Sequence, residues 1–354
     1  MIKLDAFQTH LSKLAKGGEV PRHLYILSSD EPLLMMEAQD KLRAAVKAQG
    51  FTEREILMHE RGFDWGALLS STQTMSLFGD KRYVEFRIPT GKPGRDGSDA
   101  LKQFAQQISQ ESHRHPETVI CIFLPRLDSQ TQKSAWFLAL DEAGMAVRID
   151  SIERAVLPHW IAERLKRQNQ KVESGESGQR ALGFMSEQVE GNLIAAHQEI
   201  QKLGLLYPEG QLTEEQIRDS VLNVARYDVF QLSEAYLSGD MSRINRMLDG
   251  LKGEGEALVL VVWAISEEIR TLCHLKQASL QGGNISMLMK SRRIWGKREQ
   301  LIPQALSRLS WPTLQRALSM SAQLDRQVKG LQALEMPVDP WDGLRRIGGL
   351  FSLR

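Results

Sequence analysis

The sequence predicts an α/β domain with a mostly parallel sheet, followed by two helical domains. Apolar strands alternate with helical segments up to about residue 150, and nearly continuous helical periodicity follows from there. The chain has 354 residues, of which 42% are hydrophobic and 25% are charged. A chain of this length and composition is expected to form two or three domains with real cores.

The first domain is predicted from strands that are separated by helical segments. Residues 23–27 form a short apolar strand, and residues 30–48 then carry apolar side chains at helical spacing. Further strands are predicted at residues 83–88, 119–124 and 146–149. A parallel sheet with flanking helices is the simplest arrangement of such segments. Residues 91–98, with three glycines and a proline, are expected to form a surface loop.

The remaining chain is predicted to be helical. Helices are expected at residues 155–166, 179–190, 192–206, 229–237, 241–251, 256–279, 311–331 and 340–350. Asn192 is a candidate N-cap. Residues 207–211 break the pattern before Thr213 and Gln216, which have the spacing of a capping box. These breaks divide the chain into predicted domains at residues 1–148, 149–211 and 212–354.

Charge and apolar runs exclude several classes of protein. The 45 basic and 44 acidic residues leave a net charge of +1, so any contact with nucleic acid must be local. The longest strongly apolar run, residues 257–265, is much shorter than the roughly 20 residues that cross a membrane. The N-terminus lacks an export signal, so we expect a cytoplasmic protein without membrane contacts. Cys121 and Cys273 are expected to be buried, reduced thiols.

Five segments of the sequence together resemble one protein family. They are residues 23–34, 73–78, 190–203, 226–235 and 324–330. In order and spacing they are similar to the delta subunits of bacterial DNA polymerase III clamp loaders, and the resemblance covers essentially the whole chain. It implies a RecA-like AAA+ module, a helical lid and a helical collar that joins subunits. The implied partners are the beta sliding clamp, the gamma/tau ATPase subunits, delta-prime, and primer–template DNA within the complex.

The position of a nucleotide-binding loop is degenerate in this sequence. A nucleotide-hydrolysing relative would carry glycines and a lysine between the first strand and its helix, to wrap and reach the phosphates. That position reads Ser28, Ser29, Asp30, Glu31 and Pro32, and its two carboxylates would repel phosphates. The strand at residues 119–124 also lacks acidic residues directly after it, where magnesium would be held. We therefore expect no cofactor and no ATP hydrolysis by this chain.

The positive functional signal follows a helical segment that begins near Asp64. It consists of Gln73, Met75, Ser76, Leu77 and Phe78. Adjacent apolar side chains that enter a pocket each contribute about 1.5 to 3 kcal/mol, and a glutamine can fix the register by hydrogen bonding. From the segment alone, packing into the protein's own core is the favoured interpretation. The family resemblance reverses this preference and implies a clamp-binding element.

A basic segment late in the chain has two interpretations. It contains Lys290, Arg292, Arg293, Trp295, Lys297 and Arg298. Such a segment can contact DNA, because cations neutralise phosphates while an aromatic ring stacks on bases. Alternatively, Ile294 and Trp295 anchor an amphipathic helix with a solvated basic face, which is the favoured interpretation.

No enzyme motif emerges from the other polar residues. His113 and His115 are expected in a solvated turn rather than a metal site. The pair Glu267 and Glu268 is expected to be exposed on a helix. Two rival functions stay open: an active AAA+ ATPase with a divergent loop, and a different clamp-binding helical adaptor in replication or repair.

Overall fold

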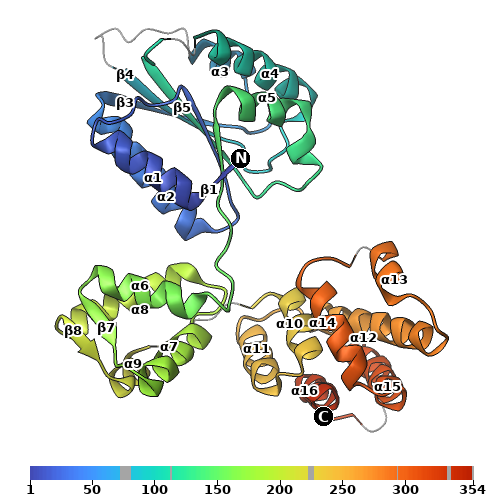
Figure 1. Cartoon of the computed structure of the whole chain (residues 1–354). Coiled ribbons are helices and arrows are strands. Elements are labelled where there is room, and N and C mark those ends of the chain that lie inside the picture. The colour runs from blue at the N-terminus through green and yellow to red at the C-terminus, as the bar shows by residue number, and fades with distance from the viewer. Residues whose placement is uncertain (72–80, 112–113, 222–226, 293, 333–335, 353–354) are drawn as a thin grey trace. The chain divides into compact units, whose positions relative to one another are not determined.

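The structure is a computed structural model that describes residues 1–354 except 72–80, 112–113, 222–226, 293, 333–335 and 353–354. The chain forms two compact units, Met1–Trp160 and Ile161–Arg354 (Figure 1). The predicted division into three domains is a finer one and stays a prediction.

The first unit is built on a six-stranded sheet. Its strands are β1 (Ile2–Lys3), β2 (Leu24–Ser28), β3 (Phe51–Met58), β4 (Lys81–Arg87), β5 (Thr118–Leu124) and β6 (Met145–Arg148). They lie in the order β1-β6-β2-β5-β4-β3, and every neighbouring pair is parallel. The predicted parallel sheet is thus confirmed. Parallel strands in this order place β3 at one edge and the carboxyl ends of β2 and β5 side by side.

Helices cover both faces of this sheet. They are α1 (Leu4–Ala15), α2 (Pro32–Ala48), α3 (Trp65–Ser71), α4 (Gly94–Glu111), α5 (Ala135–Ala143) and the short 3-10 helix η1 (Thr131–Lys133). Helices α1 and α2 lie on one face, and α3, α4 and α5 lie on the other (Figure 1). The strand side chains that face α3, α4 and α5 are apolar and buried, including Val84, Phe86 and Ile122.

The predicted surface loop at residues 91–98 is wrong in its second half, because helix α4 begins at Gly94. The helix buries an apolar face that includes Leu101, Phe104 and Ile108. Gly97 lies so close to Trp65 that a Cβ atom there would overlap the indole ring. The glycine that suggests a loop in the sequence therefore makes room for packing between α3 and α4.

The second unit is mainly helical. Helix α6 (Leu157–Arg167) crosses the boundary between the units. Helices α7 (Glu176–Gln188), α8 (Leu193–Leu206) and α9 (Glu214–Ser220) follow, with the two-stranded parallel sheet of β7 (Gln170–Val172) and β8 (Gly210–Leu212). The remaining helices are α10 (Val229–Ser238), α11 (Met241–Gly253), α12 (Leu258–Leu280), α13 (Ile285–Ser291), α14 (Lys297–Arg308), α15 (Trp311–Val328) and α16 (Pro340–Ser352).

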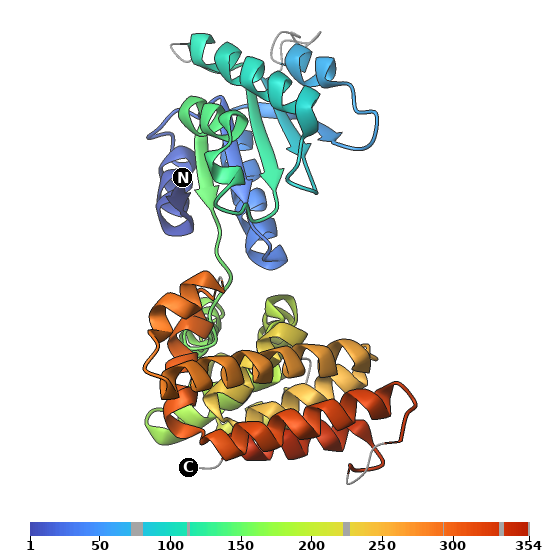
Figure 2. The same ribbon diagram turned by 90° about the vertical axis from the view of Figure 1, so that its right-hand side faces the viewer.

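The C-terminal helices share one large core. Helix α15 lies beside both α12 and α16 (Figure 2). The core includes Ile265, Leu272, Leu324 and Phe351, all of which are buried. The helix predicted at residues 256–279 corresponds to α12, and one face of it packs into this core.

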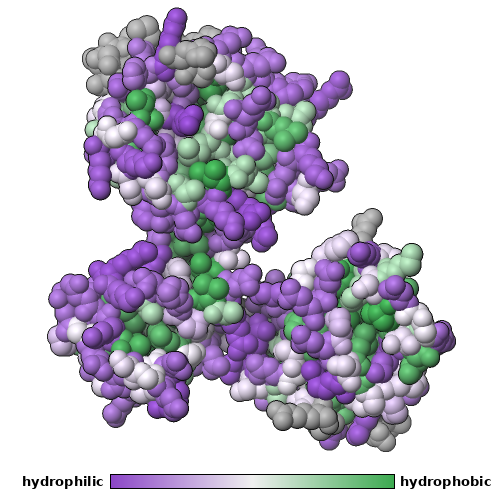
Figure 3. Space-filling view, in the orientation of Figure 1, coloured by the Kyte–Doolittle hydropathy of each residue, from purple (hydrophilic) through white to green (hydrophobic). Residues whose placement is uncertain are grey.

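Both cysteines are buried, as expected. Hydrophilic residues make up much of the visible surface of each unit, with hydrophobic patches between them (Figure 3). Within the described residues, no helix has the length and apolar character needed to span a bilayer.

Candidate functional site

The loop between β2 and α2 is tied to its own protein by serine hydroxyls. The Oγ of Ser28 donates a hydrogen bond to the carbonyl of Pro125 at 2.8 Å. The Oγ of Ser29 donates to the carbonyl of Ile149 at 3.0 Å. Since Pro125 follows β5 and Ile149 follows β6, these bonds hold the loop against the carboxyl ends of both neighbouring strands.

The backbone amides of this loop are also engaged. The N–H of Ser29 donates to the carbonyl of Leu124 at 3.1 Å, and the N–H of Glu31 donates to the Oγ of Ser29 at 2.9 Å. The side chain of Glu31 caps helix α2 by accepting from the N–H of Leu33 at 3.3 Å. Pro32 has no N–H to offer. The N–H groups of Ser29, Glu31 and Leu33 are therefore satisfied within the protein, and Pro32 offers none.

Both loop carboxylates accept hydrogen bonds from backbone N–H groups of the protein. Asp30 accepts a hydrogen bond from the N–H of Arg126 at 2.8 Å. Burial raises the pKa of Glu31, and the bond from Leu33 offsets this only in part. Because Glu31 takes the N-cap position, its carboxylate already interacts with the positive end of the helix dipole.

The acidic residue after β5 has a local structural role. The Oδ1 of Asp128 accepts from the N–H of Thr131 at 2.6 Å, at the start of η1. Hydrogen bonds from Thr131 lower the pKa of Asp128. In the part of the chain that the structure describes, no group of three or more His, Cys, Asp or Glu residues could hold a metal ion.

The predicted clamp-binding residues, Gln73, Met75, Ser76, Leu77 and Phe78, lie outside the described residues, and their assignment stays a prediction. The segments on either side are described. Helix α3 confirms the helix that was predicted to begin near Asp64, and β4 starts at Lys81.

Helix α3 is anchored by an aromatic cluster. The ring of Trp65 packs against Phe63 and Phe86, with ring centroids 5.2 and 5.7 Å apart, and against His59 at 5.0 Å. Phe86 belongs to the buried face of β4. The helix that leads into the predicted clamp-binding element is therefore fixed to the sheet.

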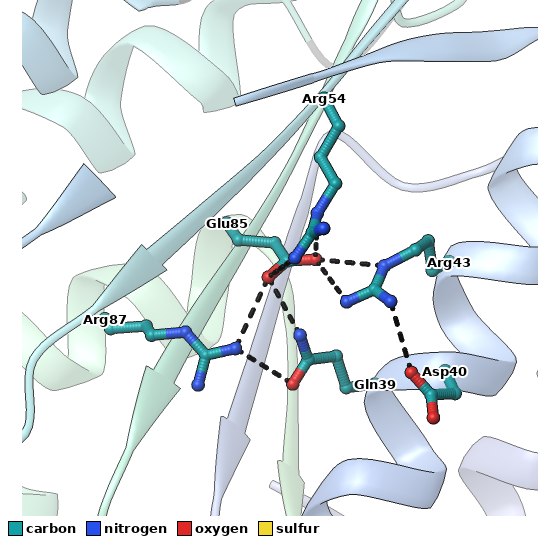
Figure 4. A network of polar contacts seen from close by, with 6 residues as sticks. All are labelled: Gln39, Asp40, Arg43, Arg54, Glu85 and Arg87. Carbon is teal, nitrogen blue, oxygen red and sulfur yellow. Dashed lines mark hydrogen bonds and ion pairs between the residues drawn. The ribbon is translucent and has the colours of Figure 1, made fainter. Parts of the chain in front are cut away.

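A polar cluster that the sequence did not predict lies on the face of the sheet opposite to α3. The carboxylate of Glu85, in β4, has no exposed surface and accepts hydrogen bonds from four side chains (Figure 4). They are Gln39 and Arg43 on α2, Arg54 on β3 and Arg87 on β4. We call these five residues the Glu85 cluster.

The geometry of the Glu85 cluster keeps its carboxylate charged. Arg54 donates from Nε to Oε1 and from Nη2 to Oε2, both at 3.0 Å. Arg43 donates to Oε1 at 3.2 and 2.9 Å. Burial alone would raise the pKa of Glu85, but the bonds from Arg54 and Arg43 outweigh burial and hold that pKa below its ordinary value.

The sequence of β4 contains a signal for this cluster. Val84, Phe86 and Ile88 share one face of the strand, so Glu85 and Arg87 must share the other face. An acidic residue in a strand of a sheet that is covered by helices on both faces needs buried partners. The sequence does not identify them, because Arg43 and Arg54 are 42 and 31 residues away.

The basic segment late in the chain does not form the single helix that was expected. Ile294 and Trp295 lie between α13 and α14, and Arg293 lies outside the described residues. Ile294 is buried, whereas 59% of Trp295 is exposed. Ile294 thus anchors the segment as expected, but Trp295 does not.

The expectation that Glu268 is exposed is wrong. Glu268 is buried and forms an ion pair with Arg298 at 3.0 Å. Burial raises the pKa of Glu268 although Arg298 opposes this. Arg298 is consequently engaged within the protein, while Lys290, Arg292 and Lys297 stay close to the exposed indole in sequence.

Two family models match the chain. The model for the DNA polymerase III delta subunit matches residues 25–150, which include the loop and the Glu85 cluster. The model for the C-terminal part of the processivity clamp loader gamma complex of DNA polymerase III matches residues 229–338.

Curated relatives support the same family over nearly the full length. The chain is 29% identical to the DNA polymerase III subunit delta of Escherichia coli over 315 residues, which cover 89% of this chain and 88% of that protein. It is 24% identical to the Haemophilus influenzae subunit delta, with 86% and 89% covered. Among solved structures, the Bacillus subtilis DNA clamp loader delta protein matches 98% of this chain and 99% of its own, with a TM-score of 0.52 and 18% identity. This last match concerns the fold alone.

Proposed function

The chain belongs to the family of DNA polymerase III delta subunits, which are clamp-loader subunits, and on this basis we propose that it binds the beta sliding clamp and helps to open it. This clamp binding and opening is proposed to take place in the cytoplasm during DNA replication. The gamma/tau subunits and delta-prime are the proposed partners, and gamma/tau would supply the ATP hydrolysis.

The non-hydrolysing role is supported mainly by the hydrogen bonds and the carboxylates of the loop between β2 and α2. The N–H groups of Ser29, Glu31 and Leu33 are engaged by Leu124, Ser29 and Glu31, and the two carboxylates of the loop would repel phosphates. A divergent but active ATPase is the rival function. Saturable ATP binding by the isolated chain would favour that rival.

Clamp binding is assigned to Gln73, Met75, Ser76, Leu77 and Phe78. Support comes from the resemblance of this segment to the family and from its place directly after α3, which the aromatic cluster fixes to the sheet. The apolar pair Leu77 and Phe78 would supply most of the affinity by entering a clamp pocket, and Gln73 would fix the register.

Opening the clamp requires no chemistry in this chain. A ligand shifts an equilibrium only by its differential affinity for the two states. The proposed wedge of Leu77 and Phe78 therefore binds the clamp more tightly when the nearby ring interface is released. ATP binding by partner subunits would control exposure of the wedge, and hydrolysis would release the clamp on DNA.

The test is to replace Leu77 and Phe78 together by alanine and to measure affinity for immobilised clamp. Each side chain is expected to contribute about 1.5 kcal/mol or more, so the double change should weaken binding roughly 100-fold. The matched control replaces Leu205 and Leu206, two exposed leucines at the end of α8, by alanine. This control should bind as the unchanged chain does.

Two outcomes would contradict the proposal. Unchanged clamp affinity after loss of Leu77 and Phe78 refutes the assigned element. In a second arm, the unchanged chain is titrated with a clamp whose ring interface has been weakened by substitution. Equal affinity for the weakened and the intact ring would leave binding in place but refute the opening role.

A further inference from the structure

Strand β3 leaves one edge of the sheet open. Within the described residues it is the last strand in the sheet order and pairs only with β4. The N–H of His59 donates to the carbonyl of Arg87 at 2.8 Å. Because backbone groups alternate sides along a strand, the N–H and carbonyl groups of Arg54, Ile56 and Met58 point toward the open edge. An extended peptide could pair with these groups.

The side chains beside this edge are both apolar and basic. In the register of the sheet, Ile56 pairs with Glu85 and Met58 pairs with Arg87, so Ile56 and Met58 lie on the face that carries the Glu85 cluster. Ile56 and Met58 are 51% and 41% exposed. We call Arg54, Ile56 and Met58 the β3 edge.

The Glu85 cluster has more positive than negative charge. The guanidinium groups of Arg43, Arg54 and Arg87 surround the one carboxylate of Glu85, and the only other acid in the drawn network is Asp40, which pairs with Arg43 at 3.2 Å (Figure 4). Three cations against two anions leave one positive charge in excess. A single arginine with two hydrogen bonds would be enough to pair a buried carboxylate. Pairing of the Glu85 carboxylate alone therefore does not account for three guanidinium groups.

Part of this hydrogen-bonding capacity is unused within the described residues. A guanidinium has five N–H groups. Within the described residues, no hydrogen bond uses Nη1 of Arg54 or the Nε and Nη1 of Arg87. Both arginines are partly exposed, and Arg87 is held in place over the ring of Phe123 at 4.9 Å. Glu85 therefore holds the guanidinium of Arg54 on the edge strand, while that of Arg87 lies one strand further in, over Phe123 of β5.

We propose that the β3 edge binds an extended acidic segment of a partner protein. The segment adds to the sheet as a further strand along β3, and its carboxylates accept hydrogen bonds from Arg54 and are attracted by the positive charge of Arg87. Its apolar side chains cover Ile56 and Met58. None of the residues proposed for clamp contact belongs to this surface, so it is an additional interaction site.

A peptide suits this surface better than nucleic acid. A peptide backbone supplies the alternating donors and acceptors that the outward groups of β3 require, and a phosphate backbone supplies acceptors only. Phosphates would also lie against Ile56 and Met58. On the other side of the strand, Glu53 and Glu55 form ion pairs with Arg82, which leaves no surplus of positive charge on β3 there.

The test uses the full chain and a terminally blocked peptide of about ten residues with alternating Glu and Thr, labelled for fluorescence anisotropy. The charge variants are Arg54→Gln and Arg87→Gln, and the edge variant is Ile56→Pro, which removes an outward N–H but keeps all three arginines. Arg54→Gln and Ile56→Pro are each expected to weaken peptide binding roughly tenfold or more, and Arg87→Gln is expected to weaken it less. Arg167→Gln, an exposed arginine on α6, is the control and should leave the affinity unchanged.

Hydrogen exchange separates strand addition from simple charge attraction. Bound peptide should slow exchange at the amides of Arg54, Ile56 and Met58. Normal exchange of β4 in each variant confirms that the sheet is intact. Equal binding of a Lys–Thr peptide, no binding of the Glu–Thr peptide, or full binding by Ile56→Pro overturns the proposal. A single-stranded oligonucleotide that displaces the peptide and loses affinity with Arg54→Gln would also overturn it, by assigning the cluster to nucleic acid.

Discussion

The burial of Glu85 is the residue-scale feature with the largest energetic consequence. A carboxylate without exposed surface is tolerated only when it is paired and hydrogen bonded, and here Gln39 and three arginines satisfy both oxygens. Removing one partner of such a buried pair costs about 3 kcal/mol or more, because the remaining charges lose their compensation. Glu85 therefore stabilises the packing of helix α2 against strands β3 and β4, and β3 is the edge strand.

We predict that the contribution of Glu85 to stability is lost in acid. Its pKa is lower in the folded chain than the ordinary value of 4.5. A group of this kind contributes its full stability above the unfolded pKa and loses it as the pH falls through the lower folded pKa. The variant Glu85→Gln should therefore be about 3 kcal/mol less stable near neutral pH and approach the unchanged chain well below pH 4.5.

The measurement is native-state hydrogen exchange in β4, followed from neutral to acidic pH in both proteins. A local probe is needed because a chain with two compact units need not unfold in one step. The variant Asp99→Asn, which removes an exposed acid on α4, is the control and should change little at any pH. A stability difference for Glu85→Gln that is the same at neutral and acidic pH would contradict the role of its charge.

At the scale of single elements, the sequence predicts those whose local signals agree with their packing. Asn192 caps α8 by accepting from the N–H of Ala195 at 3.1 Å, and Thr213 and Gln216 form the predicted capping box of α9. Both signals act over three residues, so tertiary context cannot override them easily.

The elements that the sequence analysis missed depend on distant contacts. Strand β3 is polar and largely exposed, because an edge strand buries few side chains, so it lacks the apolar pattern of a buried strand. The start of α4 is rich in glycine, and its packing depends on Trp65, more than thirty residues away. The short strands β7 and β8 pair with each other, and neither has an independent pattern.

The segment between α13 and α14 carries a prediction of its own. Trp295 is exposed between cationic residues, which favours the DNA interpretation over the anchoring one for this side chain. Stacking of a base on an aromatic ring contributes about 1 to 3 kcal/mol. Trp295→Ala should therefore weaken binding of single-stranded DNA to the chain roughly fivefold or more, as measured by fluorescence anisotropy at low salt.

A matched control is available on the neighbouring helix. Met287, on α13, is also exposed, and Met287→Ala should leave DNA affinity unchanged because a thioether offers no stacking face. Lys297→Gln should reduce the dependence of affinity on salt concentration, since one phosphate contact is lost. If Trp295→Ala binds DNA as tightly as the unchanged chain, the segment is a solvated surface and not a DNA contact.

At the scale of the whole molecule, the fold could be predicted further than the site. The parallel sheet and most of the helices follow from periodicity, and the family follows from segments spread along the chain. The residue types from Ser28 to Pro32 also predict a degenerate nucleotide-binding loop, and this stays a prediction. The hydrogen bonds of this loop to Pro125 and Ile149 could not be predicted, because they join residues about 100 positions apart.

Clamp binding and subunit assembly should be separable in this molecule. Helix α12 buries one face in the C-terminal core, but Val259, Leu260 and Trp263 near its start are exposed, with 49% of Trp263 accessible. Large apolar side chains on an outer helical face suit an interface with a neighbouring subunit. We call Val259, Leu260 and Trp263 the α12 stripe and assign it to the predicted collar. None of these residues belongs to the proposed clamp-binding element.

The prediction is that Val259→Ser combined with Trp263→Ser abolishes co-elution with the ATPase subunits and delta-prime, and leaves affinity for the clamp unchanged. The alanine variant of Leu77 and Phe78 should behave in the opposite way, entering the complex but failing to bind the clamp. Leu280→Ser, at the other end of α12, is the control for an exposed apolar residue outside the stripe. Each buried side chain contributes about 1.5 to 3 kcal/mol, so loss of two should weaken assembly by at least about 100-fold. If the serine variant still assembles, the interface lies elsewhere. If it loses both assembly and clamp binding, hydrogen exchange in α15 shows whether the substitutions have unfolded the C-terminal core.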